Sequence, residues 1–476
     1  MLAKNVLLII FIGIAAFATA GCIQSAGENN NEVKTPVVTM TVPVTPLTGS
    51  DAVVSQKLDE YMTALTDAGR FSGTVLVARG DTVVLSKGYG RANYEFRVPH
   101  TPETVMPIAS NTKQLTAAAI MKLQEQGLLN ITDPVTGYIP GATNWKDIRI
   151  YHLLNHTSGI PSDGAFPLTD PADLTLPETM ERIAALPLTF EPGTSHSYSN
   201  NGFIVLSYII EKASGMSYEE YLKTNLFLPL GMNSTGQDNA REVFANRASG
   251  YTTMGGNPVH YDLQNIHNSW GAGSIHSTTE DLFQWMRAFH TAEILSPQST
   301  TAMIDNHYGI ESGKIMNHTY IGHTGRNFGF ISQTLYFPEE NLSIIFLTNH
   351  DRTPVVTLMN DLTAIAFNTS YSLPQTIDRK PIPLAARALA EYTGTYAPAW
   401  ERSWTITVYA DGDRLFYDSV MPGDKKVELY SMGNDTFFVT PESSDAFIFT
   451  RDAAGKIDGM KMYTMEGSYD ESEKVS

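Results

Sequence analysis

Two pairs of strand patterns stand at opposite ends of a mainly helical middle region, and this arrangement constrains the fold most. Residues 73–78 and 82–85 are short apolar runs joined across Arg-Gly-Asp, which predicts a hairpin. Residues 330–337 and 342–348 form a second pair around the turn Pro-Glu-Glu-Asn. The residues from about 105 to 310 carry helical patterns and long loops. The sequence therefore predicts an α+β fold in which the two ends of this region close one antiparallel sheet.

The first residues have the parts of a secretory signal. Lys4 precedes an apolar run at 6–18, and the small residues up to Gly21 stand directly before the lone Cys22. This boundary resembles the lipobox of prokaryotic lipoproteins, although Thr19 occupies the position where that motif usually has Leu. An uncleaved anchor is the alternative, but the run is short for a membrane span of about 20 residues. We expect a signal peptide over 1–21, a lipid on Cys22, and an exported protein anchored to the cell membrane.

The remaining chain divides by composition. Residues 22–51, rich in Thr, Pro, Val and Asn, predict an extended tether. The main domain is expected at 52–370, and 371–385 is a second linker with three prolines. Residues 386–476 show several short strand patterns separated by turns, which predicts a small β-barrel. The acidic stretch 466–473 is interpreted as a solvated tail.

The composition excludes several classes of function. A formal net charge of −18 argues against a nucleic-acid surface, because binding there requires Lys and Arg to neutralise phosphates. With one cysteine, no intramolecular disulfide can form. The twelve histidines include no H-E-x-x-H pair, so we expect no metal site. Neither a G-x-G-x-x-G run nor a P-loop is present, and no cofactor is expected.

One Ser-x-x-Lys sequence, Ser110 to Lys113, opens a run of good helix formers that reaches Gln126 just before Gly127. Residues three apart share a helix face, so the amine could reach the hydroxyl. A serine needs a base to become a nucleophile, and a lysine acts as one when burial lowers its pKa. The spacing alone is common, and Ser110 could simply cap the helix.

Two further motifs follow in order, Tyr198-Ser-Asn200 and His323-Thr324-Gly325. With them the chain resembles the serine β-lactamase/penicillin-binding superfamily, whose signature is S-x-x-K, S-D-N and K-T-G. The variants here, with flanking phrases such as Leu-Leu-Asn-His-Thr-Ser-Gly at 153–159, resemble its class C-like and S12 peptidase branch over residues 52 to 368. The C-terminal region resembles the lipocalin-like domain of some S12 peptidases.

The resemblance implies a role for each residue of the three motifs. Ser110 would form an acyl-enzyme, with Lys113 and Tyr198 moving its proton and Asn200 orienting the lysine and the substrate amide. Which of Lys113 and Tyr198 is the operative base stays open. The backbone N–H groups of Ser110 and Arg326 would hold the oxyanion.

His323 departs from the K-T-G form, because imidazole is mostly neutral at pH 7 while lysine is a permanent cation. This difference weakens the recognition of anionic β-lactams and of a terminal D-Ala carboxylate. The H-x-G form is familiar from D-aminopeptidase-like peptidases and from esterases. We therefore expect an S12-type serine peptidase acting on a peptide or small-molecule substrate. An esterase, a β-lactamase and a non-catalytic penicillin-binding or scaffold protein are the alternatives, and the oligomeric state is left open.

Overall fold

The computed structural model describes residues 47, 49–139, 141–162, 174–239, 242–254, 257–260, 266–374, 380–398, 402, 405–419, 426–439, 446–463 and 469–476. The expected signal peptide at 1–21, the lipidation site Cys22 and nearly all of the expected tether lie outside these residues. Among the helices of the described part, none is long and apolar enough to cross a membrane.

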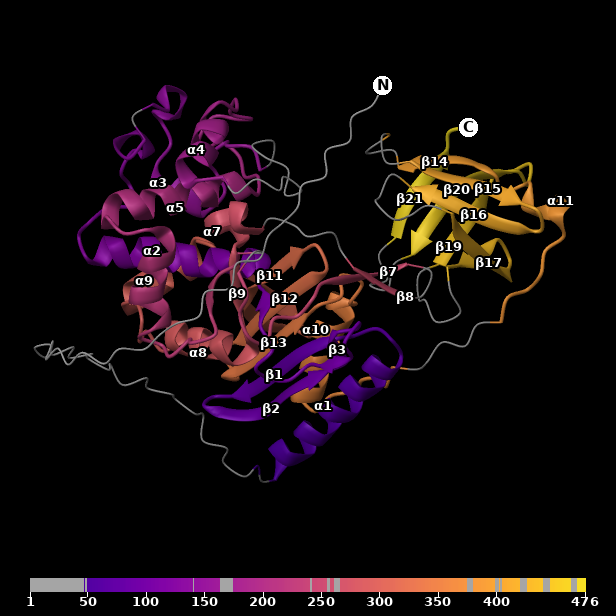
Figure 1. The fold of residues 1–476 in the computed structure, drawn as a ribbon, viewed down its shortest axis with the longest axis horizontal. Helices are drawn as coiled ribbons and strands as arrows, with labels where there is room; N and C mark the ends of the chain where they lie inside the picture. Colours follow the sequence, from indigo (N-terminus) through magenta and orange to yellow (C-terminus); the bar gives the residue numbers. More distant parts are fainter. Residues whose placement is uncertain are drawn as a thin grey trace, which may run out of the picture. The chain divides into compact units, whose positions relative to one another are not determined.

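A six-stranded antiparallel sheet forms the centre of the main domain, in the order β10-β11-β12-β13-β1-β2. The pairing of β1 with β13, from Gly73 opposite Thr348 to Arg79 opposite Leu342, joins the early strands to the late ones. Figure 1 shows this as indigo strands lying beside orange strands. The predicted α+β fold is confirmed. The strands span Glu311–Ile315 (β10), His318–Asn327 (β11), Phe330–Phe337 (β12), Leu342–Thr348 (β13), Gly73–Arg79 (β1) and Thr82–Tyr89 (β2).

The central strands β12, β13 and β1 are buried on both faces, and their side chains alternate between the two faces. Val75 and Val77 of β1 pack with the helices Ser50–Asp67 (α1) and Val355–Ala366 (α10). Leu76 and Ala78 belong to the larger cluster that includes the central helices. The result is a three-layer arrangement with α1 and α10 on one face of the sheet and the helical region on the other.

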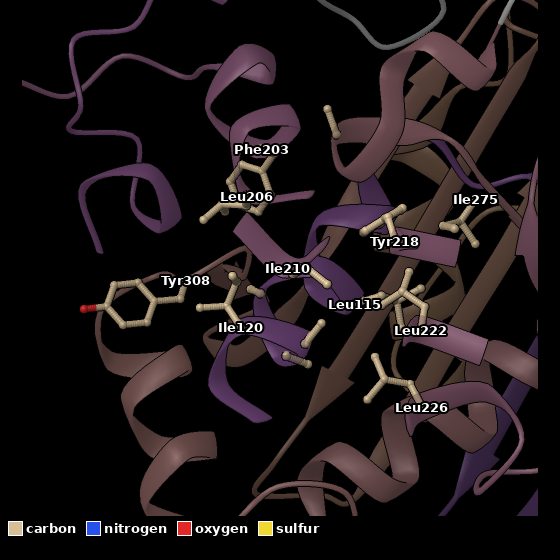
Figure 2. Packing of buried hydrophobic residues seen from close by; sticks show 14 of the residues in the cluster. Leu115, Ile120, Phe203, Leu206, Ile210, Tyr218, Leu222, Leu226, Ile275 and Tyr308 are labelled. Carbon is tan, nitrogen blue, oxygen red and sulfur yellow. The ribbon is translucent and has the colours of Figure 1, made fainter. Parts of the chain in front are cut away.

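The helix α2 (Thr112–Glu125) is the centre of the helical region, and most of its side chains are buried. Leu115 and Ile120 lie among apolar residues of α5 and α6, including Ile210 and Tyr218 (Figure 2). The charge-poor sequence of α2 is explained by this position. The other helices here are Ile150–Leu154 (α3), Leu176–Ala184 (α4), Asn200–Ser214 (α5), Tyr218–Leu222 (α6), Trp270–Gly273 (α7), Thr279–His290 (α8) and Pro297–Asp305 (α9).

Short strands and single helical turns connect these elements. Three small sheets pair β3 with β4, β7 with β8, and β9 with both β5 and β6. Their bounds are Arg91–Asn93 (β3), Val98–Pro99 (β4), Met106–Pro107 (β5), Gly236–Gln237 (β6), Tyr251–Met254 (β7), Asn257–His260 (β8) and Ile275–Ser277 (β9). The short helical turns are Ala109–Asn111 (η1), Val135–Gly137 (η2), Thr143–Trp145 (η3), Lys223–Phe227 (η4) and Ile266–Ser269 (η5).

The C-terminal region is a closed barrel of eight antiparallel strands, preceded by the short helix Ala386–Leu389 (α11). Aromatic and aliphatic side chains fill its core, Phe437, Phe447 and Phe449 among them. The strands are Gly394–Pro398 (β14), Ile406–Asp411 (β15), Arg414–Ser419 (β16), Val427–Gly433 (β17), Thr436–Phe438 (β18), Ala446–Arg451 (β19), Ile457–Tyr463 (β20) and Tyr469–Lys474 (β21).

The interpretation of 466–473 as a solvated tail is wrong for its described part. Residues from Tyr469 onward form β21, which pairs with both β20 and β14 and so closes the barrel. Glu471 and Glu473 are exposed, while Ser472 between them is buried. This alternation is typical of a strand with one solvent-exposed face. The acidic residues therefore mark the outer face of a strand.

Candidate active site

Ser110 lies in the turn that joins the small strand β5 to the buried helix α2. It belongs to the 3-10 turn η1, and Asn111, not Ser110, stands at the N-cap of α2. Ala109 directly before it has a φ of 46°, a left-handed conformation that costs free energy in a non-glycine residue. Strain of this kind is typical of functional turns and presents the partly exposed Ser110 side chain at the start of the helix.

A buried polar network fixes this turn against the sheet. The amide of Asn111 donates to Ser332 Oγ at 2.7 Å, and its Oδ1 accepts from Gln114 Nε2 and Thr334 Oγ1 at 2.8 Å each. The hydroxyl of Ser332 donates in turn to the carbonyl oxygen of Ile108 at 2.5 Å. Because these groups satisfy one another away from water, they hold the Ser110 turn in one position relative to β12.

Lys113 is fully buried, and its Nζ lies close to three oxygen atoms. It contacts Ser110 Oγ at 3.0 Å, Asn200 Oδ1 at 2.9 Å and the carbonyl oxygen of Ala272 at 2.7 Å. Burial lowers the pKa of Lys113 to about 7, with the Glu311 carboxylate acting in the opposite direction. The lysine therefore exchanges its proton near neutral pH.

The three partners of Lys113 decide where its lone pair points when it is neutral. A carbonyl oxygen can only accept, so Ala272 O and Asn200 Oδ1 require the two N–H bonds that a neutral amine can direct at them. The remaining position on Nζ faces Ser110 Oγ. The neutral amine is thus oriented to take the serine proton.

Tyr198 and Asn200 enter the site from the start of helix α5. Ser199 is the N-cap of this helix, and its Oγ accepts from the N–H of Gly202 at 3.0 Å. The cap fixes its two neighbours, so that Tyr198 Oη donates to Ser110 Oγ at 2.9 Å. Burial raises the pKa of the Tyr198 phenol above its usual value, and the hydroxyl keeps its proton at neutral pH.

His156 also belongs to this site, and it lies in the phrase at 153–159 that resembles the family. Its Nδ1 accepts from the N–H of Ser199 at 3.1 Å, and its ring lies 4.6 Å from the Tyr198 ring, centroid to centroid. Burial and the nearby Lys113 lower the pKa of His156 to about 3, so the imidazole is neutral. His156 therefore positions Tyr198 through the Ser199 backbone and through the contact between the two rings.

The H-T-G motif lies on β11, which passes directly beside the Ser110 turn. A Cβ at Gly325 would stand 2.2 Å from the carbonyl oxygen of Ile108, 2.4 Å from Ser332 Oγ and 3.1 Å from the backbone N of Ser110. Only glycine permits this approach. It brings the backbone of Arg326, the next residue, toward Ser110, while the Arg326 guanidinium donates to the carbonyl oxygen of Asp351 at 3.0 Å.

His323 is nearly fully buried on the same strand. Its Nδ1–H donates to the carbonyl oxygen of Thr324 at 2.6 Å, and the Thr324 hydroxyl donates to Gln333 Oε1 at 2.7 Å. Burial, together with the charge of Lys113, lowers the pKa of His323 to about 3. The imidazole is therefore neutral and supplies no cation to the site.

Glu311 is a residue that the sequence patterns did not indicate. It begins β10, and its Oε2 accepts from the N–H of Thr324 at 3.1 Å while Oε1 lies 3.7 Å from His323 Nε2. Partial burial raises the pKa of this carboxyl, against the opposing effects of the Thr324 N–H and Lys113. The structure thus brings all three motifs together around Ser110 and adds a carboxyl group beside them.

Comparison with known proteins shows which family the chain matches. Residues 54–367 match the Beta-lactamase family, and residues 378–475 match a domain of unknown function, DUF3471. Penicillin-binding protein 4* of Bacillus subtilis (strain 168) is 27% identical over 449 residues, covering 83% of this chain and 94% of that protein.

Two solved structures share the fold. The octameric penicillin-binding protein homologue from Pyrococcus abyssi superposes with a TM-score of 0.59 at 24% identity, covering 88% of this chain and 99% of that one. A D-amino acid amidase from Ochrobactrum anthropi SV3 superposes with a TM-score of 0.60 at 22% identity, covering 66% and 99%. The family match spans well over half of the sequence and includes the three motifs gathered around Ser110, and the chain is a member of the Beta-lactamase family, among the serine hydrolases related to penicillin-binding proteins.

Proposed function

We propose that this protein is an exported serine peptidase or amidase that cleaves amide bonds next to D-residues through an acyl-enzyme on Ser110. One observation carries the proposal. The Ser110 hydroxyl lies within 3.0 Å of both Lys113 Nζ and Tyr198 Oη, and the lysine is buried enough to be neutral near pH 7. A serine with a base on one side and a proton donor on the other is equipped for acyl transfer.

Two hydrogen bonds at Ser110 Oγ, one with Lys113 Nζ and one with Tyr198 Oη, place a base and a proton donor at the reacting oxygen. Ser110 Oγ attacks the substrate carbonyl carbon, and its proton passes to the neutral amine of Lys113. The leaving amine takes a proton from the Tyr198 hydroxyl, which Lys113 then reprotonates, and the C–N bond breaks to leave an ester on Ser110. Water attacks this ester with the same groups acting in reverse, which releases the acid and restores Ser110.

The negative charge that develops on the substrate oxygen needs donors that are in place beforehand. We assign this role to the backbone N–H groups of Ser110 and Arg326. The close approach of β11 at Gly325 supports the assignment, because it brings the backbone of β11 close to the backbone N of Ser110. The Arg326 side chain is not required for this role.

The charge around the site favours peptides and amides over β-lactams. A penicillin carries a carboxylate, and the position of the K-T-G lysine is taken here by a neutral, buried imidazole. The adjacent Glu311 carboxyl makes the position still less favourable for an anion. The fold shared with a D-amino acid amidase supports the choice of D-configured amides as substrates.

The proposal is tested in two steps with the protein beyond its N-terminal signal. A fluorophosphonate probe should label the wild type and leave Ser110→Ala unlabelled. D-Alanine p-nitroanilide and short p-nitrophenyl esters are then compared as substrates. Turnover of the anilide supports the peptidase, whereas turnover of esters alone would replace it with an esterase. Absence of any Ser110-dependent label would favour a non-catalytic penicillin-binding or scaffold role.

Export and anchoring are part of the same proposal. The signal-like residues 1–21 and the following Cys22 support a lipid-modified protein held at the outer surface of the cell membrane. Metabolic labelling with an alkyne fatty acid should mark the wild type and not Cys22→Ser. If both proteins stay unlabelled while remaining in the membrane fraction, an uncleaved anchor replaces the lipid.

A further inference from the structure

Glu311 is the first residue of β10, and it lies at the edge of β11 where the pairing between these two strands begins. Its partner in the β10–β11 ladder is Gly322, and the side chain reaches two residues farther to accept the N–H of Thr324. A side-chain carboxyl thus takes the place that a neighbouring strand would fill opposite Thr324. It lies on the same stretch of β11 as Gly325, whose backbone approaches Ser110.

The position of this carboxyl relative to the reacting carbon follows from strand geometry. N–H groups two residues apart on a strand point to the same edge, so those of Thr324 and Arg326 share one. The two groups are about 7 Å apart along the strand. The Glu311 oxygen bound at Thr324 and a substrate oxygen bound at Arg326 are therefore separated by about one aminoacyl unit.

The carboxyl is accessible to a ligand, and among the described residues no Lys or Arg lies within ion-pair distance of it, although the charge of Lys113 still reaches it. The Glu311 side chain is 47% exposed, and its polar contacts are the N–H and side chain of Thr324 and the ring of His323. That ring is nearly fully buried, and its Nδ1–H is directed at the carbonyl oxygen of Thr324. Lys113 directs its three hydrogen-bonding positions at Ser110, Asn200 and Ala272.

We propose that Glu311 is a specificity-determining residue, whose carboxylate accepts a hydrogen bond from a substrate ammonium beside the scissile bond and repels a carboxylate at that position. The inference deepens the proposed function and rests on it. A charge-assisted hydrogen bond contributes about 1.5–3 kcal/mol, which corresponds to about 10- to 100-fold in kcat/KM.

The test compares wild type with Glu311→Gln, which keeps an oxygen for Thr324 N–H and removes the charge. Glu339→Gln, an exposed glutamate in the β12–β13 turn, is the matched control. One substrate series varies the acyl side, with free, N-acetyl and N-succinyl D-alanine p-nitroanilide. The other varies the leaving group of N-acetyl-D-alanine, with D-alanine, D-alaninamide and 1,2-diaminopropane.

We expect Glu311→Gln to lower kcat/KM about 10- to 100-fold for the cationic member of at least one series. The neutral member should change little and the anionic member should improve, while Glu339→Gln behaves as wild type. The series that responds identifies the side of the scissile bond on which the ammonium lies. Equal changes for all three charges in both series would overturn the inference and leave Glu311 a structural role. A wild type that hydrolyses no substrate and takes no Ser110-dependent label would instead contradict the proposed function.

Discussion

The Nζ atom of Lys113 lies 4.8 Å from the centre of the Tyr198 ring, and both side chains reach the same oxygen of Ser110. Burial shifts the pKa values of these two side chains in opposite directions. It lowers the pKa of the lysine to about 7 and raises the pKa of the phenol above its usual value. At neutral pH the amine can therefore lose its proton while the phenol keeps its own, which favours Lys113 as the group that first accepts the serine proton.

This order of proton affinities predicts the pH dependence of the reaction. A base acts only in its deprotonated form, so kcat/KM should rise with pH and level off above an inflection near 7, the pKa of Lys113. Initial rates with N-acetyl-D-alanine p-nitroanilide, whose acyl group carries no amine that titrates in this range, measure the profile between pH 5 and 9. A rate that stays flat from pH 5 to 9 would contradict a lysine base.

Replacement of Tyr198 by Phe separates its role from that of Lys113. We expect kcat to fall about 10²- to 10⁴-fold, because the leaving group loses its proton donor. The inflection near pH 7 should remain, since it belongs to the lysine. The N-cap of α5 depends on Ser199, so circular dichroism and thermal melting should show an intact fold. Disappearance of the inflection in Tyr198→Phe would transfer the role of base to the tyrosine.

Four strands of the main sheet, β1, β2, β12 and β13, could be predicted because their local patterns were strong. Residues 330–337 and 342–348 are apolar runs bounded by turn residues, and they form β12 and β13 over those same residues. The strands β10, β11 and β21 were missed for the opposite reason, because their local patterns were weak. Glu311–Ile315 is mostly exposed and contains Ser, Gly and Lys, while the exposed acids of β21 resemble a tail. Their strand structure comes from pairing, of β10 with β11 across the turn at 316–317 and of β21 with β20 and the distant β14.

The residues of the site also differ in how well the sequence predicts their positions. Ser110 and Lys113 are three residues apart, and local helix geometry predicts their proximity. Tyr198 and His323 are distant in sequence, and only the resemblance to a known family placed them at Ser110. His156 lies in the phrase at 153–159 that resembles the family, but the phrase gave the histidine no role, and Glu311 had no signal. His156 acts through Ser199, 43 residues away, and Glu311 through the backbone of Thr324, so their positions depend on the folded chain.

Gly325 should tolerate no side chain. A methyl group there would lie 2.2 Å from the carbonyl oxygen of Ile108 and 2.4 Å from Ser332 Oγ, and both are held in the network behind Ser110. We expect Gly325→Ala to displace β11 from the Ser110 turn, lowering the free energy of unfolding by about 1–3 kcal/mol. Urea unfolding and fluorophosphonate labelling measure the two effects. As a control, Gly137→Ala changes a glycine outside the site that has open space around it and no positive φ.

His156 should matter for the rate through the position of Tyr198. In His156→Phe the aromatic ring is kept, but the Ser199 N–H loses its acceptor, which costs about 1–3 kcal/mol for a buried group. We expect a lower melting temperature and a decrease in kcat with little change in KM. The inflection near pH 7 should persist, since His156 does not titrate there. A change confined to KM would mean that His156 contacts substrate instead.

The charge at position 323 should decide whether penicillins react. His323 is buried and neutral, because its surroundings lower its pKa to about 3. His323→Lys would place a cation near Glu311, where the carboxylate of a penicillin is now disfavoured. We expect faster labelling of Ser110 by a fluorescent penicillin in this variant, and slower turnover of cationic D-alanine p-nitroanilide. His323→Gln, which removes the ring without adding charge, should leave penicillin labelling at the wild-type rate. If His323→Lys and His323→Gln label equally, shape rather than charge excludes β-lactams from this site.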